Sequence, residues 1–434
     1  MKRARLVIGI GSVALATAAI AFAQRMDVRR PLTLTVGQSE GPSPTVRGGA
    51  RRDGLVHGAL PRGPLHVDWH FAAGAGQIEQ PPLVTSEAII VVTTHGDVVW
   101  IPHDAHEGHG ELARQSIGIA AAATSAPALL SNGTVVVIGG GSDAIAVGVT
   151  KTAVVFHTQL AGGLPSVANP LDAITPLALD DGGVVVATST EIALLDSSGN
   201  VRTRAALPEA ITGPLLASGG ATPSSRRIFA VSKSGVVFAW SPGGANGRDV
   251  TRVGSFQDEL SGGAVLSSED SLVGVVKESR LMTLDVRQGL AVPLASFVGG
   301  AFLGPVAFRH GVAYALAGLP GHTFAVGVDS GGQEVLRVPV ASSNALAPDG
   351  GIIAYTVPLH VPLIIDDTGT LAFAAPEGPV GVIDAAGIVS SLDNLCIRSL
   401  RGGRGVTSLV SDAPGGFVVT CGSGSVLRII HGDL

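Results

Sequence analysis

VVVATSTEIALLDSSGNV, residues Val184–Val201, contains the pattern from which the rest of the chain is built. Two short apolar runs are joined by a small polar turn, and Asp196 and a glycine then lead into a third run. Apolar runs separated by turn-forming residues are typical of a β-hairpin followed by a further strand. The stretch therefore predicts consecutive antiparallel strands.

The same pattern recurs along most of the chain. Eight copies of the hairpin align: VVTTHGDVVWI, VVIGGGSDAIAVGV, VVATSTEIALLD, FAVSKSGVVFAW, VGVVKESRLMTLD, YALAGLPGHTFAVGVD, LAFAAPEGPVGVID and VVTCGSGSVLRII. They repeat at intervals of about 47 residues, which is within the range of β-propeller blades. The interval predicts one blade for each copy.

A short apolar segment precedes each hairpin and supplies the inner strand of the blade: PPLV, APALL, TPLAL, GPLLA, GGAVL, GPVAF, VPLII and TSLVS. With the hairpin and the segment after it, each repeat has four strands. The predicted fold is all-β, a β-propeller of eight four-stranded blades. The interval from Pro305 to Pro362 is the longest and holds an extra apolar run within Ala341–His360, so seven and nine blades are the alternatives.

The apolar runs do not alternate with polar residues, as expected for strands that neighbouring blades cover on both faces. Burial of this kind accounts for a mean hydropathy of +0.43 without a membrane. A transmembrane barrel would have alternating strands of roughly ten residues and aromatic girdles, whereas aromatic residues make up 4% of this chain.

Four aspartates follow the hairpins at the start of turns that end in glycine: Asp196, Asp285, Asp329 and Asp384. An aspartate side chain accepts hydrogen bonds from the backbone ahead of it, and glycine adopts the positive φ that such a reversal requires. We interpret these aspartates as structural turn residues rather than as acids or metal ligands.

The N-terminus resembles a secretory signal peptide, with basic residues, an apolar run and the sequence Ala21-Phe22-Ala23 before Gln24. The alternative is an uncleaved membrane anchor, because the apolar run is at the lower limit for crossing a bilayer. In either case the propeller is predicted to be extracytoplasmic, periplasmic or secreted, and membrane contact is expected only if the signal stays uncleaved.

The predicted domains are the signal peptide at 1–23, a flexible basic linker at 24–62 and the propeller at 63–434. The propeller begins with a strand at Leu65–Phe71, and its last repeat supplies three strands instead of four. We expect the N-terminal strand to complete the last blade, which would close the ring and remove an open edge.

The repeat resembles that of the pyrroloquinoline-quinone-like (PQQ-like) β-propeller family, whose hairpin is followed by Ala-Leu-Asp and a glycine turn. IALLDSSGNV, LMTLDVRQGL and VGVIDAAGIV carry the resemblance, which covers about Gly48–Leu434. The family includes enzymes and assembly factors, so the resemblance implies a fold rather than one activity.

Two branches of the family fit the chain less well. Quinoprotein dehydrogenases have adjacent cysteines and a tryptophan near the end of most repeats, whereas here Cys396 and Cys421 are separated and there are three tryptophans. The propeller lipoprotein of the outer-membrane assembly machinery needs a cysteine after its signal, and none is present. The resemblance therefore implies a non-lipoprotein member, and no cofactor is predicted.

Two groups of residues are candidates for sites. His103, His106 and His109 lie in HDAHEGHG, a glycine-containing segment that we interpret as a solvated turn, with zinc binding as the weaker alternative. Cys396 and Cys421 form an even pair in an exported chain, which favours a disulfide between the last two blades. Two buried thiols are the alternative.

No zinc-protease motif or phosphate loop is present. The net charge of −6 argues against nucleic acid as a partner. We expect a monomeric, non-catalytic propeller that binds a protein, peptide or envelope component through rim turns at Thr94–Asp97, Gly139–Asp143, Ser232–Gly235 and Leu319–His322. The rival hypothesis is an enzyme, a quinoprotein oxidoreductase or another type, with a site at the central channel.

Overall fold

The computed structural model describes residues 52–432 except 53, 57, 74–75, 106–109, 120–124, 168–171, 219–225, 245–246, 320, 343–362, 376–378, 394, 397–404 and 413–414. These residues belong to one compact unit, Glu40–Leu434, and a second unit, Met1–Ser39, lies outside them. The predicted signal peptide and most of the linker are therefore outside the described residues. Among those that are described, no helix combines the length and the apolar character that crossing a membrane requires.

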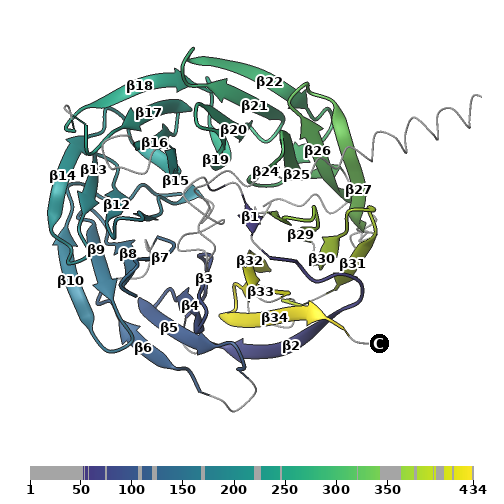
Figure 1. Cartoon of the computed structure of the whole chain (residues 1–434), viewed down its shortest axis with the longest axis horizontal. Coiled ribbons are helices and arrows are strands. Elements are labelled where there is room, and N and C mark those ends of the chain that lie inside the picture. The colour runs from purple at the N-terminus through teal and green to yellow at the C-terminus, as the bar shows by residue number, and fades with distance from the viewer. Residues whose placement is uncertain are drawn as a thin grey trace, which may run out of the picture. The chain divides into compact units, whose positions relative to one another are not determined.

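Eight sheets are arranged as the blades of a ring (Figure 1), which confirms the predicted eight-bladed propeller. Blade 1 has β3 (Leu83–Val84), β4 (Ala88–Val92), β5 (Asp97–Pro102) and β6 (Ala113–Ser116). Blade 2 has β7 (Ala128–Leu129), β8 (Val135–Gly139), β9 (Ile145–Val149) and β10 (Val154–Gln159). Blade 3 has β11 (Leu177–Ala178), β12 (Val184–Ala187), β13 (Glu191–Leu195) and β14 (Val201–Ala206). Blade 4 has β15 (Ile211–Ser218), β16 (Arg227–Ser232), β17 (Val236–Trp240) and β18 (Val250–Ser255).

The second half of the ring repeats this plan with additions. Blade 5 has β19 (Leu260–Ser268), β20 (Ser271–Val276), β21 (Arg280–Asp285) and β22 (Leu290–Ser296). Blade 6 has β23 (Ala301–Phe302), β24 (Ala307–Arg309), β25 (Val312–Leu319), β26 (His322–Asp329) and β27 (Glu334–Ser342). Blade 7 has β28 (Ile364–Asp366), β29 (Leu371–Ala374), β30 (Val380–Ile383) and β31 (Val389–Leu392), joined on the inside by β1 (Leu55–Val56). Blade 8 has β32 (Val406–Asp412), β33 (Gly416–Cys421), β34 (Ser425–His431) and β2 (Leu65–Ala72).

The core lies between successive blades. The middle strands β12 and β13 of blade 3 are buried at every position. One face of this blade packs on blade 2 and the other packs on blade 4. Burial of a Val, Leu or Ile side chain stabilises the fold by about 1.5–3 kcal/mol, so the apolar runs of the repeat are the main source of stability.

The ring closes as predicted. β2 pairs with β34 in antiparallel register, from Leu65 opposite His431 to Ala72 opposite Ser425. The first strand of the propeller is thereby the outer strand of the last blade. Trp69 of β2 is buried, and its indole Nε1 donates a hydrogen bond to the carbonyl of His103 in blade 1 at 2.6 Å.

The end of the predicted flexible linker differs from the expectation, because the described residues between Arg52 and Leu60 (52, 54–56 and 58–60) run along the axis of the ring (Figure 1). We call this stretch the axial segment. β1 pairs in parallel with β28, and the Leu60 amide donates to the buried Asp366 carboxylate at 2.9 Å. A basic and glycine-rich sequence is therefore folded here, because the inner strands of the blades supply its backbone partners.

Strand register defines the two faces of the ring. The turn between the second and third strands lies beside the start of the inner strand, as shown by the pairs Ile211–Ser232 and Leu260–Val276. We call this side the connection face: it carries those turns and the links from blade to blade. The opposite face carries the remaining turns. β1 runs from the connection face toward the opposite face, since it is parallel to β28.

The four predicted turn aspartates all lie on the opposite face, between third and fourth strands. Asp196 Oδ1 accepts from the amides of Ser198 and Asn200, both at 2.9 Å. The other three accept two amides each in the same way. Cys396 and Cys421 form a disulfide between the link into blade 8 and the end of β33. The extra apolar run expected within Ala341–His360 lies almost entirely outside the described residues.

Candidate functional site

Exposed residues at the tips of the turns give the connection face its chemistry. They differ from blade to blade and include His95, Ser142, Thr190, Lys233 and Ser423. Three of the four predicted rim turns, in blades 1, 2 and 4, are described completely and lie on this face. The fourth, Leu319–His322, joins β25 to β26 on the same face, with residue 320 outside the description.

The turns are held by the links that enter their own blades. The amide of Thr94 donates to the Gln77 carbonyl at 2.8 Å, and the amide of Lys277 donates to the Glu259 carbonyl at 3.1 Å. The amide of Ser189 makes the equivalent bond to the Gly163 carbonyl at 2.9 Å. The backbone of each turn is thus anchored while its side chains point to solvent, which suits recognition by surface loops on a rigid scaffold.

The turn of blade 5 has an unusual backbone. Lys277 and Glu278 both adopt positive φ, 47° and 57°, a region that non-glycine residues rarely occupy. Two such residues form the turn that matches the twist of a hairpin. Lys277 Nζ also pairs with Asp258 at 2.7 Å. Backbone of this kind is concentrated at functional sites, so the blade 5 turn is a candidate contact point.

Asp172 is the most perturbed acid on this face. It lies in the link between blades 2 and 3 and accepts a hydrogen bond from the amide of Gly262, in blade 5, at 2.7 Å. Burial, with smaller contributions from the charges of Glu259 and Glu278, raises its pKa to about 6. A carboxyl group that gains a proton near neutrality can act in proton transfer.

The axis of the ring is occupied by the chain itself. Arg52 is fully buried; its guanidinium donates to the carbonyls of Pro176, at 2.9 Å, and Leu215, at 3.2 Å, in blades 3 and 4. On the other side, a Cβ on Gly54 would lie 2.9 Å from the Leu363 carbonyl oxygen and 3.1 Å from the Ala307 Cβ. Because Gly54 also has φ of +70°, glycine is needed where the axial segment touches blades 6 and 7.

His103, predicted to belong to a solvated turn, is instead half-buried between blades 8 and 1. Its Nε2 lies 2.7 Å from the Thr85 carbonyl, and its Nδ1 lies 3.0 Å from Asp412 Oδ1, off the direction of a linear hydrogen bond. Asp412 is fully buried and also accepts from Arg428 Nε at 2.5 Å, while Arg428 pairs with Asp68 at 2.7 Å. We call His103, Asp412, Arg428 and Asp68 the closure clip.

The Asp412 carboxylate raises the pKa of His103 above its ordinary value, against the opposing effect of burial. With a carboxylate at one ring nitrogen and a carbonyl at the other, the imidazolium form is favoured and neither nitrogen is directed at a free position. This geometry does not suit a metal ligand, which needs a neutral imidazole nitrogen. His106 and His109 lie outside the described residues.

Within the described ranges, no group of three or more His, Cys, Asp or Glu is placed to hold a metal ion. The axial position, where a propeller can hold a ligand, contains Arg52 and β1. The described residues therefore do not fit a quinone and metal bound in the axis of the ring.

Sequence reasoning missed Arg52, Asp172 and Asp412. None belongs to a motif, and their partners are far away in the chain, 124 residues for Arg52 and Pro176. Asp412 and Arg428 are on β32 and β34, which are separated by β33, so not even their pairing could be read from adjacent strands.

No protein-family model matches the chain, and no curated protein matches it. Solved structures match over most of its length. A europium-containing methanol dehydrogenase has a TM-score of 0.61 at 11% identity, covering 91% of this chain and 98% of its own. BamB from Moraxella catarrhalis has a TM-score of 0.56 at 14% identity, covering 86% and 99%. The computationally designed protein Ika8 has a TM-score of 0.58 at 13% identity, covering 83% and 98%. At these identities the similarity shows the propeller fold alone.

Proposed function

We propose that the chain is an exported, non-lipoprotein PQQ-like propeller that works as a binding or scaffold protein. Its connection face holds a protein, peptide or envelope component. The observation that carries the proposal is the occupied axis: Arg52 and β1 take the space that a central ligand would need. The groups that remain accessible and vary from blade to blade are the turns of the connection face.

The chemistry of these turns suits a polar partner surface. His95, Ser142, Lys233 and Lys277 are exposed, and acids such as Asp143 and Glu259 lie on the same side of the ring. Mixed charges on anchored loops favour specificity of docking over raw affinity. Extracytoplasmic location is supported by the signal-like N-terminus, and N-terminal sequencing of exported protein should begin at Gln24. A mature protein that begins at Met1 would contradict this part of the proposal.

Site-specific photo-cross-linking in the native envelope tests the binding face. A photoreactive side chain placed at His95 or Ser142 should give reproducible adducts with one partner. Matched control positions are Ser198 and Gln288, which are exposed in turns of the opposite face. Equal adducts from both faces would contradict the proposal.

The second candidate function is an enzyme, quinoprotein or other, that acts at the axial mouth of the connection face. A single observation favours it: Asp172, partly buried and bonded to the Gly262 amide of blade 5, has a pKa raised to about 6. Substrate turnover by the purified chain with quinone and calcium added, abolished in Asp172→Asn, would support it. Absence of turnover together with adducts from His95 would favour the binding function.

A further inference from the structure

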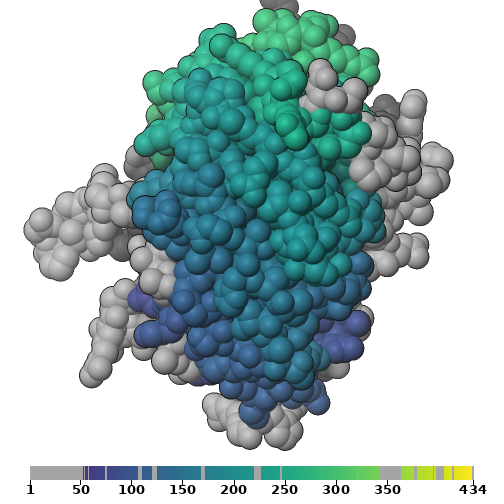
Figure 2. Space-filling view, turned by 90° about the vertical axis from the view of Figure 1, so that its left-hand side faces the viewer, coloured from purple at the N-terminus to yellow at the C-terminus, as the bar shows by residue number. Residues whose placement is uncertain are grey.

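The outer wall of the ring carries an unpartnered strand edge at blade 3. β14 is the last strand of its sheet, and no described strand pairs with its outer side. Figure 2 shows this side of the ring, where β10 and β14 lie in Figure 1, as a continuous wall. An unpaired edge presents rows of backbone N–H and C=O groups to which another chain can add a strand.

Three arginines surround this edge, and we call them the arginine edge. Arg202 and Arg204 project from β14, where their side chains are 47% and 51% exposed. Arg248 comes from blade 4, just before β18, and is exposed.

The charge of the arginine edge is poorly compensated. Arg202 lies 3.7 Å from Asp181, and Arg204 lies 3.5 Å from Glu191, whose other oxygen already accepts the Ala161 amide at 2.6 Å. Arg248 makes no ion pair with a described carboxylate. These contacts are long for charge-assisted hydrogen bonds, which measure about 2.7–2.9 Å.

Other arginines on the outer wall are neutralised more closely. Arg337 of β27 lies 2.6 Å from Glu334, and Arg114 of β6 lies 2.6 Å from Glu111 and 3.0 Å from Asp97. Two outer strands elsewhere in the ring, β22 in blade 5 and β27 in blade 6, each contain a proline, which lacks the N–H needed for strand addition. β14 has no proline.

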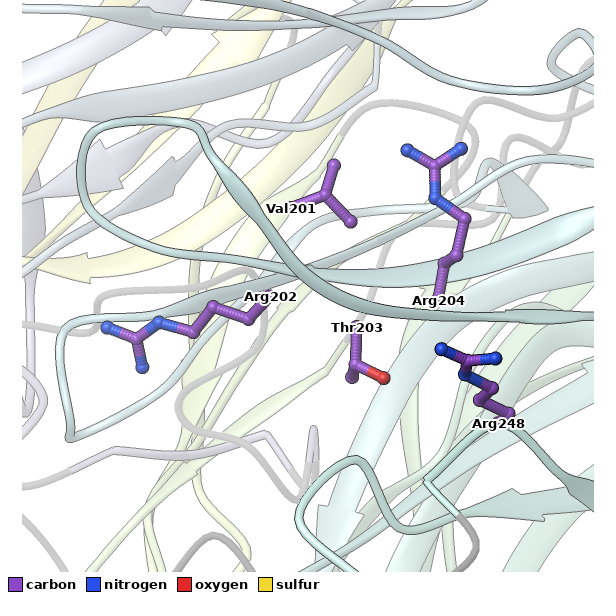
Figure 3. Close-up of a pocket in the computed structure, with 5 residues that line it drawn as sticks. All are labelled: Val201, Arg202, Thr203, Arg204 and Arg248. Carbon is purple, nitrogen blue, oxygen red and sulfur yellow. The ribbon is translucent and has the colours of Figure 1, made fainter.

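A surface hollow lies at the same place. It has a volume of about 430 Å³ and is lined by Val201, Arg202, Thr203, Arg204 and Arg248. In Figure 3, Arg204 and Arg248 lie toward one end of the hollow and Arg202 extends the other way along β14. Thr203 tethers the wall of the hollow, since its hydroxyl lies 3.4 Å from the Gly247 carbonyl in blade 4.

We propose that the arginine edge binds an acidic, extended peptide segment that adds a strand to β14. Side chains two residues apart on a strand point to the same side, about 6.6 Å apart. Arg204 follows this regular pattern, whereas Arg202 lies at a β-bulge where the pairing of β14 with β13 shifts register. Their side chains are long, so an Asp or Glu at alternate positions of the added strand can meet both, and Arg248 takes a third acid. The partner is defined by this pattern: alternate acids, an unblocked backbone, and no proline at the pairing positions.

Protection of a strand edge against aggregation also uses charged residues, but it does not account for the whole arrangement. Two arginines on β14 suffice for protection, whereas Arg248 belongs to the next blade and lines the same hollow. A long polyanion such as nucleic acid is disfavoured by the net charge of −6 and has no backbone that can pair with a strand.

The test uses the purified full chain and synthetic fluorescent peptides in an anisotropy titration at low salt. A peptide of alternating Glu and Thr should bind saturably, and binding should weaken as salt is raised. A Gln–Thr peptide should not bind. A Glu–Pro peptide has the same charge but cannot pair, and it should bind at least tenfold more weakly.

The variants are Arg202→Ser, Arg204→Ser and Arg248→Ser, each expected to weaken binding of the Glu–Thr peptide by about 2- to 5-fold, as for exposed ion pairs. The double variant Arg202→Ser/Arg204→Ser should lose about tenfold. The matched control is Arg287→Ser, which removes an exposed arginine paired with Asp270 in blade 5 and should change nothing. Unchanged thermal unfolding of the variants shows that the ring is intact.

Equal binding of the Glu–Thr and Glu–Pro peptides would overturn strand addition, and tighter binding of an oligonucleotide of equal charge would overturn the peptide assignment. No binding of the Glu–Thr peptide, or aggregation of the double variant without any change in binding, would show that the arginines only protect the edge. None of these results bears on the connection face, because adducts from His95 are measured independently.

Discussion

The closure clip predicts how much of the stability of the ring depends on one buried carboxylate. Asp412→Asn keeps the shape of the side chain and removes its charge. Asp412 is fully buried, 3.0 Å from His103 Nδ1 and 2.5 Å from Arg428 Nε. Removal of one partner from a buried ion pair costs about 3–5 kcal/mol. We expect about 3 kcal/mol, because Arg428 retains Asp68 at 2.7 Å.

The unfolding entropy of a ring of this size is about 0.8 kcal/mol/K, so the loss should lower Tm by about 4 °C. Urea unfolding and thermal unfolding of Asp412→Asn, His103→Gln and the double variant measure it. Asp258→Asn is the control: it removes an acid whose partner Lys277 is 64% exposed, and it should leave the stability nearly unchanged.

The pH dependence has a definite sign. The pKa of His103 is raised above its ordinary value of 6.5 in the folded chain. A histidine of this kind contributes stability that is fully present below pH 6.5 and is lost as the pH rises through the folded pKa. The wild type should therefore lose this contribution between mildly acidic and alkaline pH, and His103→Gln should not. Additive effects of the two substitutions at pH 5.5, or identical pH profiles for wild type and His103→Gln, would refute the closure clip.

Four further predictions concern other parts of the ring. Deletion of Leu65–Ala72 should abolish cooperative unfolding or cause aggregation, because β34 would become an open edge; an unchanged melting curve would be inconsistent with ring closure. Cys396→Ser/Cys421→Ser should cost about 3 kcal/mol in urea unfolding, from the chain entropy of a loop of this length, and the unreduced wild type should show no titratable thiols after unfolding. Arg52→Met should cost about 2–4 kcal/mol, because it leaves two buried carbonyls without their charged donor; a loss below 1 kcal/mol would indicate that the axial segment is not held by this residue. Asp172→Asn should stabilise the ring at pH 8 by about 2–3 kcal/mol. The pKa of Asp172 is raised to about 6 in the folded chain, so its ionised form destabilises the fold at pH 8, and the neutral amide removes this cost. A decrease in stability at pH 8 would contradict the desolvation of this group.

The blades could be predicted from the sequence because propeller strands are buried on both faces. VVVA at Val184–Ala187 and EIALL at Glu191–Leu195 form two strands at the expected positions, and the turn between them is polar. The proline segments became the inner strands; TPLAL, for example, contains β11. Leu65–Phe71 was predictable as the closing strand because the last repeat lacks one.

The polar interior could not be predicted in the same way. The sequence around Arg52 is basic and rich in glycine, which is the composition of a solvated linker. Its burial depends on carbonyls that the ring brings to the axis from blades 3 and 4. HDAHEGHG likewise has the composition of a loop, and His103 is half-buried where Asp412 and Thr85 meet. Local patterns carry no record of such long-range partners.

The axial segment also determines how the ring responds to mechanical load. A pull on the chain at Arg52, directed out of the connection face, acts along the axis. It shears the parallel pairing of β1 with β28 and the bonds of the Arg52 guanidinium at the same moment. β2 follows β1 in the chain and is loaded only after β1 has been released, so it is shielded from being peeled off β34 one pair at a time. A propeller tethered through its centre therefore resists tension as a whole ring, whereas one tethered at its outer strand would open at the seam between its first and last strands.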